Sequence, residues 1–498
     1  MNGAERIYVA STSEGDTSSR LAEELARRIE DDIASGDYAA GVALGGLREL
    51  SARYSAGRSV VREALGLLER RGLGRMRPGP CGGFILSKPK PEIIGAQLAD
   101  YFRAIGVTLS QVMDAREAVD LMAARLASAR VAVTHGGLPA NGHSQADLAP
   151  QRLAVPNTDL SGLLSARLGI ARVAREPVLL AFVECLNALT ADFHPLGEST
   201  PGNVRRAEAA LARALLAGDV EATAVAAARA HHELAAWLAE SGAGMLSPSR
   251  EETAVASPAR GSSQGCRAGQ TPPPAGRLSS TIARQLAADI AQRKTAGARL
   301  GSEWDLCERF NVSRLTLRQA IRLLEDSGLV ECRRGRGNGL IVRDRRTAGS
   351  IRLLLAYLIG EKVDPMAAGT ILFQLNCFVP ALAVARADTR GRAELQVALS
   401  RVESSDPFDR YDLLGLVHCV SRLAESPIID LFSRCLVAYE ARFRASLSER
   451  LPGRAQAHYF QLVRRLLDHL PIGDSGKLEW AKAESSALML QMSQHRPI

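Results

Sequence analysis

Two stretches of the chain repeat each other, and this repeat limits the possible folds more than any other feature of the sequence. Residues 44–85 align with residues 300–341 at a constant offset of 256, without a gap. The matching positions run along the whole stretch: Leu44/Leu300, Leu50/Leu306, Arg53/Arg309, Arg58/Arg314, Arg62/Arg318, Ala64/Ala320, Leu67/Leu323, Leu68/Leu324, Glu69/Glu325, Gly72/Gly328, Leu73/Leu329, Gly79/Gly335 and Gly83/Gly339. Because a fixed period indicates a duplicated structural unit, the chain is expected to contain two copies of one fold.

The first copy has the pattern of two short helices joined by a tight turn and followed by a hairpin. Its expected elements, in order, are a helix at 21–34, a short helix at 47–53, a turn at 54–57, a second helix at 58–71 and a hairpin tip at 79–83. Apolar residues four positions apart indicate the first helix, and Gly72 ends the last one. Glycines typical of a tight turn indicate the hairpin. This order predicts a winged helix-turn-helix.

Arginines occur at the start of the second short helix in both copies. Arg58 and Arg62 are four residues apart and therefore share a helix face, and Arg314 and Arg318 match them in the second copy. The second helix of a helix-turn-helix enters the DNA major groove with its N-terminal residues at the base edges. An arginine fork suits that place, because it pairs with guanine or with a phosphate. In the second copy, Ser313 is the expected N-cap of this helix.

The domain organisation follows from the repeat and from the composition between the copies. A segment rich in Ser, Gly, Pro and Ala separates them, and such a composition predicts a flexible linker. After each helix-turn-helix, an Ala- and Leu-rich part favours helices. We predict a mainly α fold in five parts: winged helix-turn-helix 18–88, helical domain 92–240, linker 241–276, winged helix-turn-helix 277–346 and helical domain 350–492.

Both copies resemble the GntR family of bacterial regulators, whose signature is close to SRxxVREALxxLExxGLVxxxxGxGxFV. Residues 57–85 are GRSVVREALGLLERRGLGRMRPGPCGGFI, and residues 313–341 are SRLTLRQAIRLLEDSGLVECRRGRGNGLI. The resemblance implies binding to double-stranded DNA through these residues: Arg48, Arg58, Ser59, Arg62, Gly79, Ser313, Arg314, Thr316, Arg318 and Gly335. It further implies that each copy binds one half of a short inverted repeat.

Some positions depart from the family pattern. Gly57 replaces the capping Ser or Thr of the first copy, which is expected to cost only a few tenths of a kcal/mol. Trp304 stands where the first copy has Arg48, so one expected contact is missing from the second copy. Leu315 and Gln319 also differ from the usual residues, and the two copies are therefore expected to prefer different half-sites.

The helical parts resemble the all-helical FadR-like ligand-binding domain (FCD domain) found in one branch of this family. The resemblance implies a small carboxylate effector and often a metal held by three histidines and an aspartate. In the first copy His231 or His232 matches the last histidine, but Arg167 and Glu208 occupy the other two histidine positions. In the second copy Val417 takes the first position, with His418 beside it. We therefore predict that the metal site is lost or very weak, with no metal and no cofactor.

The composition agrees with a regulator and argues against other classes. The net charge is +8, and residues 44–88 hold nine basic against three acidic residues, compared with ten against seven in 300–346. The eight cysteines form no CxxC pair, which is typical of reduced cytoplasmic thiols. The absence of an 18-residue apolar run predicts no membrane span. Without a glycine-rich phosphate loop, a GxSxG or an HExxH motif, and without room for an aminotransferase-like domain, the chain is not expected to be an enzyme.

The leading hypothesis is a cytoplasmic transcriptional regulator, a repressor or an activator, with two DNA-binding domains. The two copies could form a pseudo-dimer within the chain, or two chains could form a homodimer with four such domains. The alternative is a co-regulator or scaffold in which the second DNA-binding domain, or both sensing domains, are degenerate. Trp304 and the smaller charge excess of the second copy favour that alternative.

Overall fold

The structure is a computed structural model, and it is described here as two compact units. The described residues are 17–35, 38, 41–79, 82–135, 159–193, 199–241, 279, 282–283, 285–287, 289–290, 297–326, 329–332, 339–342, 347–404, 410–443, 453–469 and 481–482. The first unit comprises residues 1–94 and 352–363, and the second comprises 95–351 and 364–498. Helices dominate the described part of the chain, and the strands are short, which confirms the mainly α fold class. The predicted linker 241–276 lies almost wholly outside the described residues.

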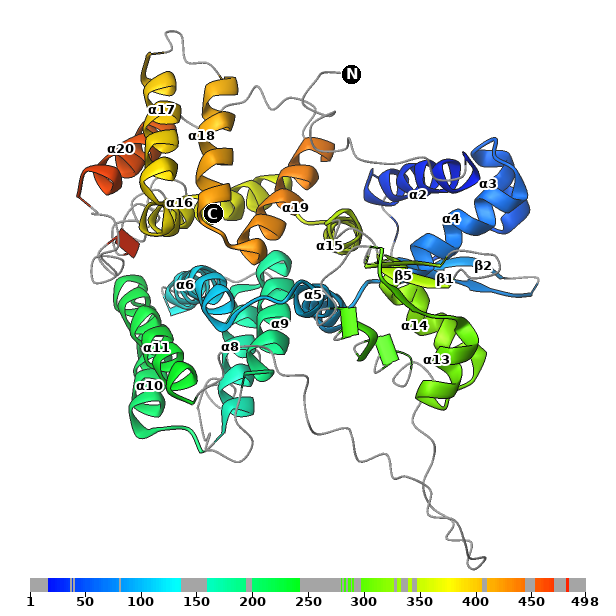
Figure 1. The fold of residues 1–498 in the computed structure, drawn as a ribbon, viewed down its shortest axis with the longest axis horizontal. Helices are drawn as coiled ribbons and strands as arrows, with labels where there is room; N and C mark the ends of the chain where they lie inside the picture. The colour runs from blue at the N-terminus through cyan, green and yellow to red at the C-terminus, as the bar shows by residue number, and fades with distance from the viewer. Residues whose placement is uncertain are drawn as a thin grey trace, which may run out of the picture. The chain divides into compact units, whose positions relative to one another are not determined.

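The first unit contains three helices and a β-hairpin, which we call the first winged domain (Figure 1). Its elements are α2 (Thr17–Ser35), α3 (Leu47–Arg53), α4 (Arg58–Arg70), β1 (Gly74–Arg77) and β2 (Gly83–Leu86). The two strands pair antiparallel, with Gly74 opposite Leu86 and Arg77 opposite Gly83. The predicted helix, turn, helix and hairpin are thus present in the predicted order.

An apolar core holds the hairpin against the helices of the first winged domain. Ile29 of α2 and Phe84 of β2 are fully buried in it. The Phe84 backbone N–H donates to the Gly45 carbonyl at 2.9 Å, and a Cβ on Gly83 would lie 2.8 Å from the same oxygen. Gly83 also has a φ of +136°, a conformation that favours glycine. The close approach explains why the second copy has Gly339 at the matching position.

A helix from the second half of the sequence contributes to the core of the first unit. Residues 352–363, which include most of α15 (Ala348–Gly360), belong to this unit. Ala356 is fully buried in the same apolar cluster as the winged domain. A Cβ on Gly360 would lie 2.7 Å from Cδ of Pro89, so a larger residue at this position would force the helix away. The first winged domain is therefore completed by residues that follow the second one in sequence.

The second unit contains the second winged domain, which repeats the arrangement of the first. Its elements are β3 (Arg299–Gly301), α13 (Glu303–Phe310), α14 (Arg314–Asp326), β4 (Val330–Cys332) and β5 (Leu340–Val342). Ile282, Leu286 and Ile290 are buried, as are the matching residues Leu25, Ile29 and Ile33 of α2 in the first winged domain. Strand β5 pairs antiparallel with both β3 and β4, so this wing has three strands. The prediction of a hairpin missed β3, which is only three residues long.

The first helical set of the second unit is arranged around one central helix (Figure 1). Its helices are α5 (Pro91–Ile105), α6 (Leu109–His135), α8 (Leu160–Ala174), α9 (Pro177–Ala191), α10 (Gly202–Ala217) and α11 (Val220–Glu240). Helix α6 contacts α8, α9, α10 and α11. Side chains on several faces of α6 are consequently buried, and these include charged ones.

The second helical set has the same plan. Its helices are α16 (Pro365–Arg386), α17 (Thr389–Ser404), α18 (Arg410–Leu423), α19 (Pro427–Phe443) and α20 (Gly453–His469). Helix α16 contacts α18, α19 and α20 and is mostly buried. By length and composition alone α16 could cross a membrane, but such burial is typical of the core helix of a globular domain.

The two helical sets contact each other through matching elements. Helix α6 contacts both α16 and α19. The turn before α9 has Arg175 in the left-handed region, and the turn before α19 has Glu425 there, with φ of 52° and 48°. Seven residues after these turns, Phe182 of α9 and Phe432 of α19 stack with their ring centroids 3.7 Å apart and their planes 3° apart. The interface thus brings equivalent positions of the two copies together.

Candidate nucleic-acid interface

Helix α4 presents three of the predicted DNA contacts on its exposed face. Arg58, Ser59 and Arg62 are all exposed, whereas Val61 and Leu65 are buried in the core of the first winged domain. The burial of Val61 and Leu65 fixes the rotation of α4, and this rotation directs the two arginines outward. The structure therefore places these predicted residues together on one solvent-facing surface.

The start of α4 and the neighbouring helix α3 add to this surface. Gly57 caps α4 without a side-chain hydrogen bond, which leaves the first N–H groups of the helix open to an anion. Arg48 of α3 is exposed, and α3 packs against α4. Within the described ranges, no hydrogen bond, ion pair or ring contact engages the side chains of Arg48, Arg58 or Arg62. Three guanidinium groups are thus ready to pair with phosphates or bases.

The wing of the first domain is basic and exposed. Arg75, Met76 and Arg77 of β1 are exposed, and the strand buries only its first residue. Gly79, another predicted contact, follows β1 with a φ of +114°, which explains the need for glycine at this turn. A basic wing supplies further groups for the DNA backbone.

The second winged domain has a better helix cap than the first. The Ser313 hydroxyl accepts a hydrogen bond from the Thr316 backbone N–H at 3.2 Å, so Ser313 is the N-cap as predicted. The two side-chain hydroxyls of Ser313 and Thr316 are also 2.9 Å apart. Arg314 and Leu315 are exposed on α14. Gly335, the remaining predicted contact of this copy, lies outside the described residues.

Both recognition-helix arginines of the second domain already have a partner on α13. Arg318 donates to the Glu303 carboxylate through Nε and Nη2, each at 3.0 Å. The guanidinium carbon of Arg314 lies 5.4 Å from the ring centroid of Trp304. The hydrogen bond from Arg318 lowers the pKa of Glu303, which therefore stays ionised. Sequence analysis identified Trp304 but missed Glu303, the residue beside it.

A buried ionic cluster occupies the place that the family resemblance assigns to a metal. Arg167 of α8 donates to Asp120 of α6 at 2.5 Å and to Glu208 of α10. Arg116 donates to the same Asp120 oxygen at 3.2 Å, and all four side chains are buried. Burial lowers the pKa of Arg167, but the charges of Glu208 and Asp120 outweigh this effect and raise it. A guanidinium has no lone pair for a metal and occupies both carboxylates, so these residues do not fit a divalent metal.

His231 of α11 lies beside this cluster and is the buried member of the adjacent pair of histidines. Its Nε2 is 3.7 Å from Oε2 of Glu117, and its buried Nδ1 has no hydrogen-bond partner in the described part of the chain. Burial, reinforced by the charges of Arg167 and Lys482, lowers the pKa of His231 well below its usual range. The imidazole is therefore neutral at physiological pH. In the second copy, His418 is exposed on α18.

Arg125 of α6 is a buried cation that has no counter-charge among the described residues. Its side chain is 7% exposed, and its Nε makes no hydrogen bond to any described residue. Burial lowers its pKa to about 10, and no carboxylate offsets that effect. A buried charge without a partner is costly, so this position favours an anion that the described residues do not supply.

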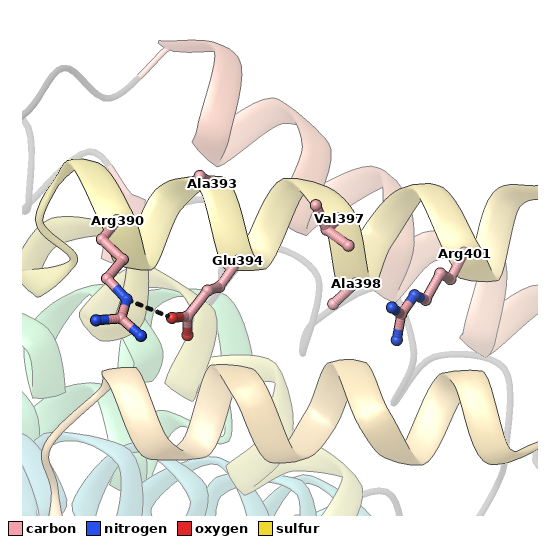
Figure 2. A pocket seen from close by; sticks show the side chains of 6 residues that line it. All are labelled: Arg390, Ala393, Glu394, Val397, Ala398 and Arg401. Atoms are coloured by element: carbon pink, nitrogen blue, oxygen red, sulfur yellow. Dashed lines mark hydrogen bonds and ion pairs between the residues drawn. The ribbon is translucent and has the colours of Figure 1, made fainter.

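An open groove runs along α17 in the second helical set. Arg390, Ala393, Glu394, Val397, Ala398 and Arg401 line it, and its volume is about 340 Å³. Figure 2 shows Arg390 directed at Glu394, and the two form an ion pair at 3.2 Å. Because the groove is open to solvent and Arg390 is paired with Glu394, it is a weaker candidate for a carboxylate than the surroundings of Arg125.

Comparison with known proteins assigns both winged domains to one family. Residues 21–80 and 278–339 match the family model described as bacterial regulatory proteins, gntR family. The first match covers α2, α3 and α4 and enters the wing, and the second covers the corresponding part of the second domain. A search of curated proteins found no match. The chain therefore carries two DNA-binding helix-turn-helix domains of the GntR family in tandem.

Proposed function

Because two GntR-family DNA-binding domains support a transcriptional regulator, we propose that this chain reads an inverted-repeat operator with two recognition helices, α4 and α14. The observation that carries this proposal is the surface formed by Arg48, Arg58 and Arg62, whose guanidinium groups are exposed and unpaired within the described residues. Exposed arginines at the start of a recognition helix can pair with guanine edges, and those on the flanking helix can bind phosphates.

We propose that the two copies form a pseudo-dimer within one chain. The stack of Phe182 on Phe432 supports this assembly, because a two-fold interface brings equivalent residues together. Fusion into one chain keeps the second DNA-binding domain at a high effective concentration once the first is bound. A homodimer of chains is the other arrangement compatible with the family, and it would carry four such domains.

Response to a small carboxylate effector is the second part of the proposal. Its support is the buried Arg125 of the first helical set, whose Nε has no hydrogen-bond partner among the described residues. A carboxylate that reached this guanidinium would make a charge-assisted hydrogen bond and remove the cost of the unpaired charge. A panel of small mono- and dicarboxylates should therefore contain members that change operator affinity, and Arg125→Gln should abolish that change. A panel without any active member would remove the effector from the proposal.

One observation favours the alternative of a degenerate second DNA-binding domain. Glu303 and Trp304 engage Arg318 and Arg314 of α14, whereas no described residue engages Arg58 or Arg62 of α4. In that case the chain acts as a regulator anchored by a single half-site, or as a co-regulator.

The test of the proposed function is selection of bound sequences from a random DNA pool with the intact chain. The same selection is then made with Arg58→Ala and with Arg314→Ala. An inverted repeat in which each variant loses one half is the expected result for a pseudo-dimer. A motif altered only by Arg58→Ala would support the degenerate second domain. A pool without enrichment would overturn the assignment as a sequence-specific regulator.

A further inference from the structure

The two winged domains carry the same recognition arginines in different surroundings. Arg62 and Arg318 match at the constant offset of 256, but the residue that faces the arginine differs. Position 303 is Glu303, which binds Arg318 through two hydrogen bonds, whereas the matching Leu47 packs against the core of the first domain. A single aligned position thus decides whether the arginine is paired.

The next position in the sequence shows a second difference. Trp304 is 64% exposed and lies against the guanidinium of Arg314, whereas the matching Arg48 is an exposed cation. Leu315, the second residue of α14, is 69% exposed where the first domain has Ser59. At these three aligned positions the second domain lacks one cation and one hydroxyl, and it adds one carboxylate.

We propose that Glu303 and Trp304 make the second winged domain the weaker of the two DNA-binding domains, so that the first domain anchors the chain on its operator. This inference rests on the proposed function, because it assumes that α4 and α14 face DNA. Glu303 and Trp304, both on α13, set the difference in DNA affinity between the two domains.

The physical basis is the local charge rather than the strength of the ion pair. Arg318 and Glu303 have side chains 55% and 32% exposed, and pairs at such exposure contribute little free energy. DNA could therefore separate them easily. However, Glu303 remains ionised and would then face the phosphates, while the pair as a whole carries no net charge. The second domain should therefore release fewer counterions than the first when it binds DNA. Both its affinity for DNA and the salt dependence of its binding should be lower.

Trp304 acts in the same direction by a different route. In the first domain Arg48 is available for a phosphate, and the loss of one such contact reduces the salt dependence by about one unit of slope. An indole ring cannot replace that contact, and it also holds the face of the Arg314 guanidinium.

The test is an exchange of these residues between the two domains in the full-length chain. To isolate the second domain, Glu303→Leu with Trp304→Arg is made in a chain that also carries Arg58→Ala and Arg62→Ala. Affinity for the selected operator is expected to rise about tenfold or more, with a steeper dependence on salt. The converse variant is Arg48→Trp in the otherwise natural chain, which leaves the core contact of Leu47 in place and should weaken binding and reduce the salt slope by about one unit.

The outcomes separate this inference from the proposed function. Unchanged or weaker binding by the Glu303→Leu, Trp304→Arg chain, while the natural chain binds its operator, would overturn the inference alone. A natural chain that enriches no sequence would overturn both. Glu303→Gln provides a second variant that keeps the shape of the side chain. This variant should show part of the gain in operator affinity. An unchanged affinity would show that the charge of Glu303 does not weaken DNA binding.

Discussion

Phe182 and Phe432 hold equivalent positions in the two halves of the chain, and their rings stack in parallel at 3.7 Å. A side chain that contacts its own counterpart is the sign of a two-fold axis, which normally relates separate subunits of a homodimer. Here the two counterparts belong to one sequence, so this contact is made within the molecule. The copies need not remain identical, because each side of the interface is encoded separately.

The first prediction concerns this interface and the assembly state. If the faces of the two helical sets that carry Phe182 and Phe432 cover each other within one chain, the protein should be a monomer. Light scattering should then give a mass of 53.3 kDa. Phe182→Ala and Phe432→Ala should each lower the free energy of unfolding by about 3–5 kcal/mol, because both rings are fully buried. Their effects should not add, because they share one contact.

A control for the stacking prediction is Phe193→Ala, which removes another fully buried ring of the first helical set. Its effect should add to that of Phe432→Ala. A mass of twice 53.3 kDa would show that copies of the chain associate instead.

The second prediction concerns the recognition helix of the first domain. Arg58→Ala or Arg62→Ala should weaken operator binding by about 1–3 kcal/mol, because each removes a guanidinium from the surface that faces the bases. Titration of a labelled operator at several salt concentrations measures both the affinity and the salt slope. Arg205→Ala, an exposed position on α10, is the control for a simple loss of charge and should leave the affinity unchanged. Equal losses in all three variants would contradict the assignment of α4 to the major groove.

The third prediction concerns the buried cluster around Arg167. Arg167→Ala leaves Glu208 buried without its cation and Asp120 with Arg116 alone, which should lower the stability by about 3–5 kcal/mol. Arg422→Ala breaks an exposed ion pair with Glu394 and should cost less than about 1 kcal/mol. Chemical denaturation compares the two variants, and equal effects would contradict the structural role of the cluster.

The fourth prediction concerns metal at the same place. The natural chain should keep its melting temperature when a chelator is added, because the guanidinium of Arg167 takes the place of a metal. Replacement of both Arg167 and Glu208 by histidine would set two imidazoles beside Asp120 and His231, a donor set that suits zinc. That variant should bind zinc in a direct titration, whereas the natural chain should not. Stoichiometric zinc in the purified natural chain would overturn this prediction.

The fifth prediction concerns pH. His231 stays neutral in the folded chain, whereas an ordinary histidine takes up a proton near pH 6.5. Below that pH the unfolded state binds more protons, so stability should fall by up to about 1.4 kcal/mol per pH unit and should be regained above it. The groups that face the ring are Arg116, Glu117, Arg167, His232 and Lys482.

His231→Gln should make the stability less dependent on pH between 5 and 7, which thermal melts at several pH values can measure. Other histidines and carboxylates titrate in the same range, so the difference between the natural chain and the variant is the relevant quantity. Parallel curves for the two proteins would show that His231 is accessible to protons in the folded state.

Much of the fold followed from the sequence because local signals agreed with the tertiary structure. The short helix at 47–53 was predicted with the bounds that α3 has, and the second helix differs from α4 by one residue. The exposed face of α4 followed from the spacing of its apolar residues. The three-residue strand β3 was missed, because so short an extended segment has no periodicity of its own.

The arrangement of the candidate site was harder to predict from the sequence. Glu303 pairs with Arg318 across 15 positions, and only the packing of α13 on α14 brings them together. The change from Leu47 to Glu303 between aligned positions was the available signal. Arg167 and Glu208 were noted as substitutions in a metal set, but their direct pairing, and the pairing of Arg167 with Asp120, required the bundle geometry. The assignment of the helical parts to the FadR-like branch stays a prediction.

Residues 352–363 complete the core of the first winged domain although they come after the second one. The two halves of the molecule are therefore interlocked rather than merely linked end to end. A truncated chain that ends at residue 240 would leave the apolar edge of its only winged domain uncovered where Ala356 now lies. Loss of the second half through a premature stop codon would thus damage the first half as well, and selection can keep the duplicated segment even where its own DNA contacts have weakened.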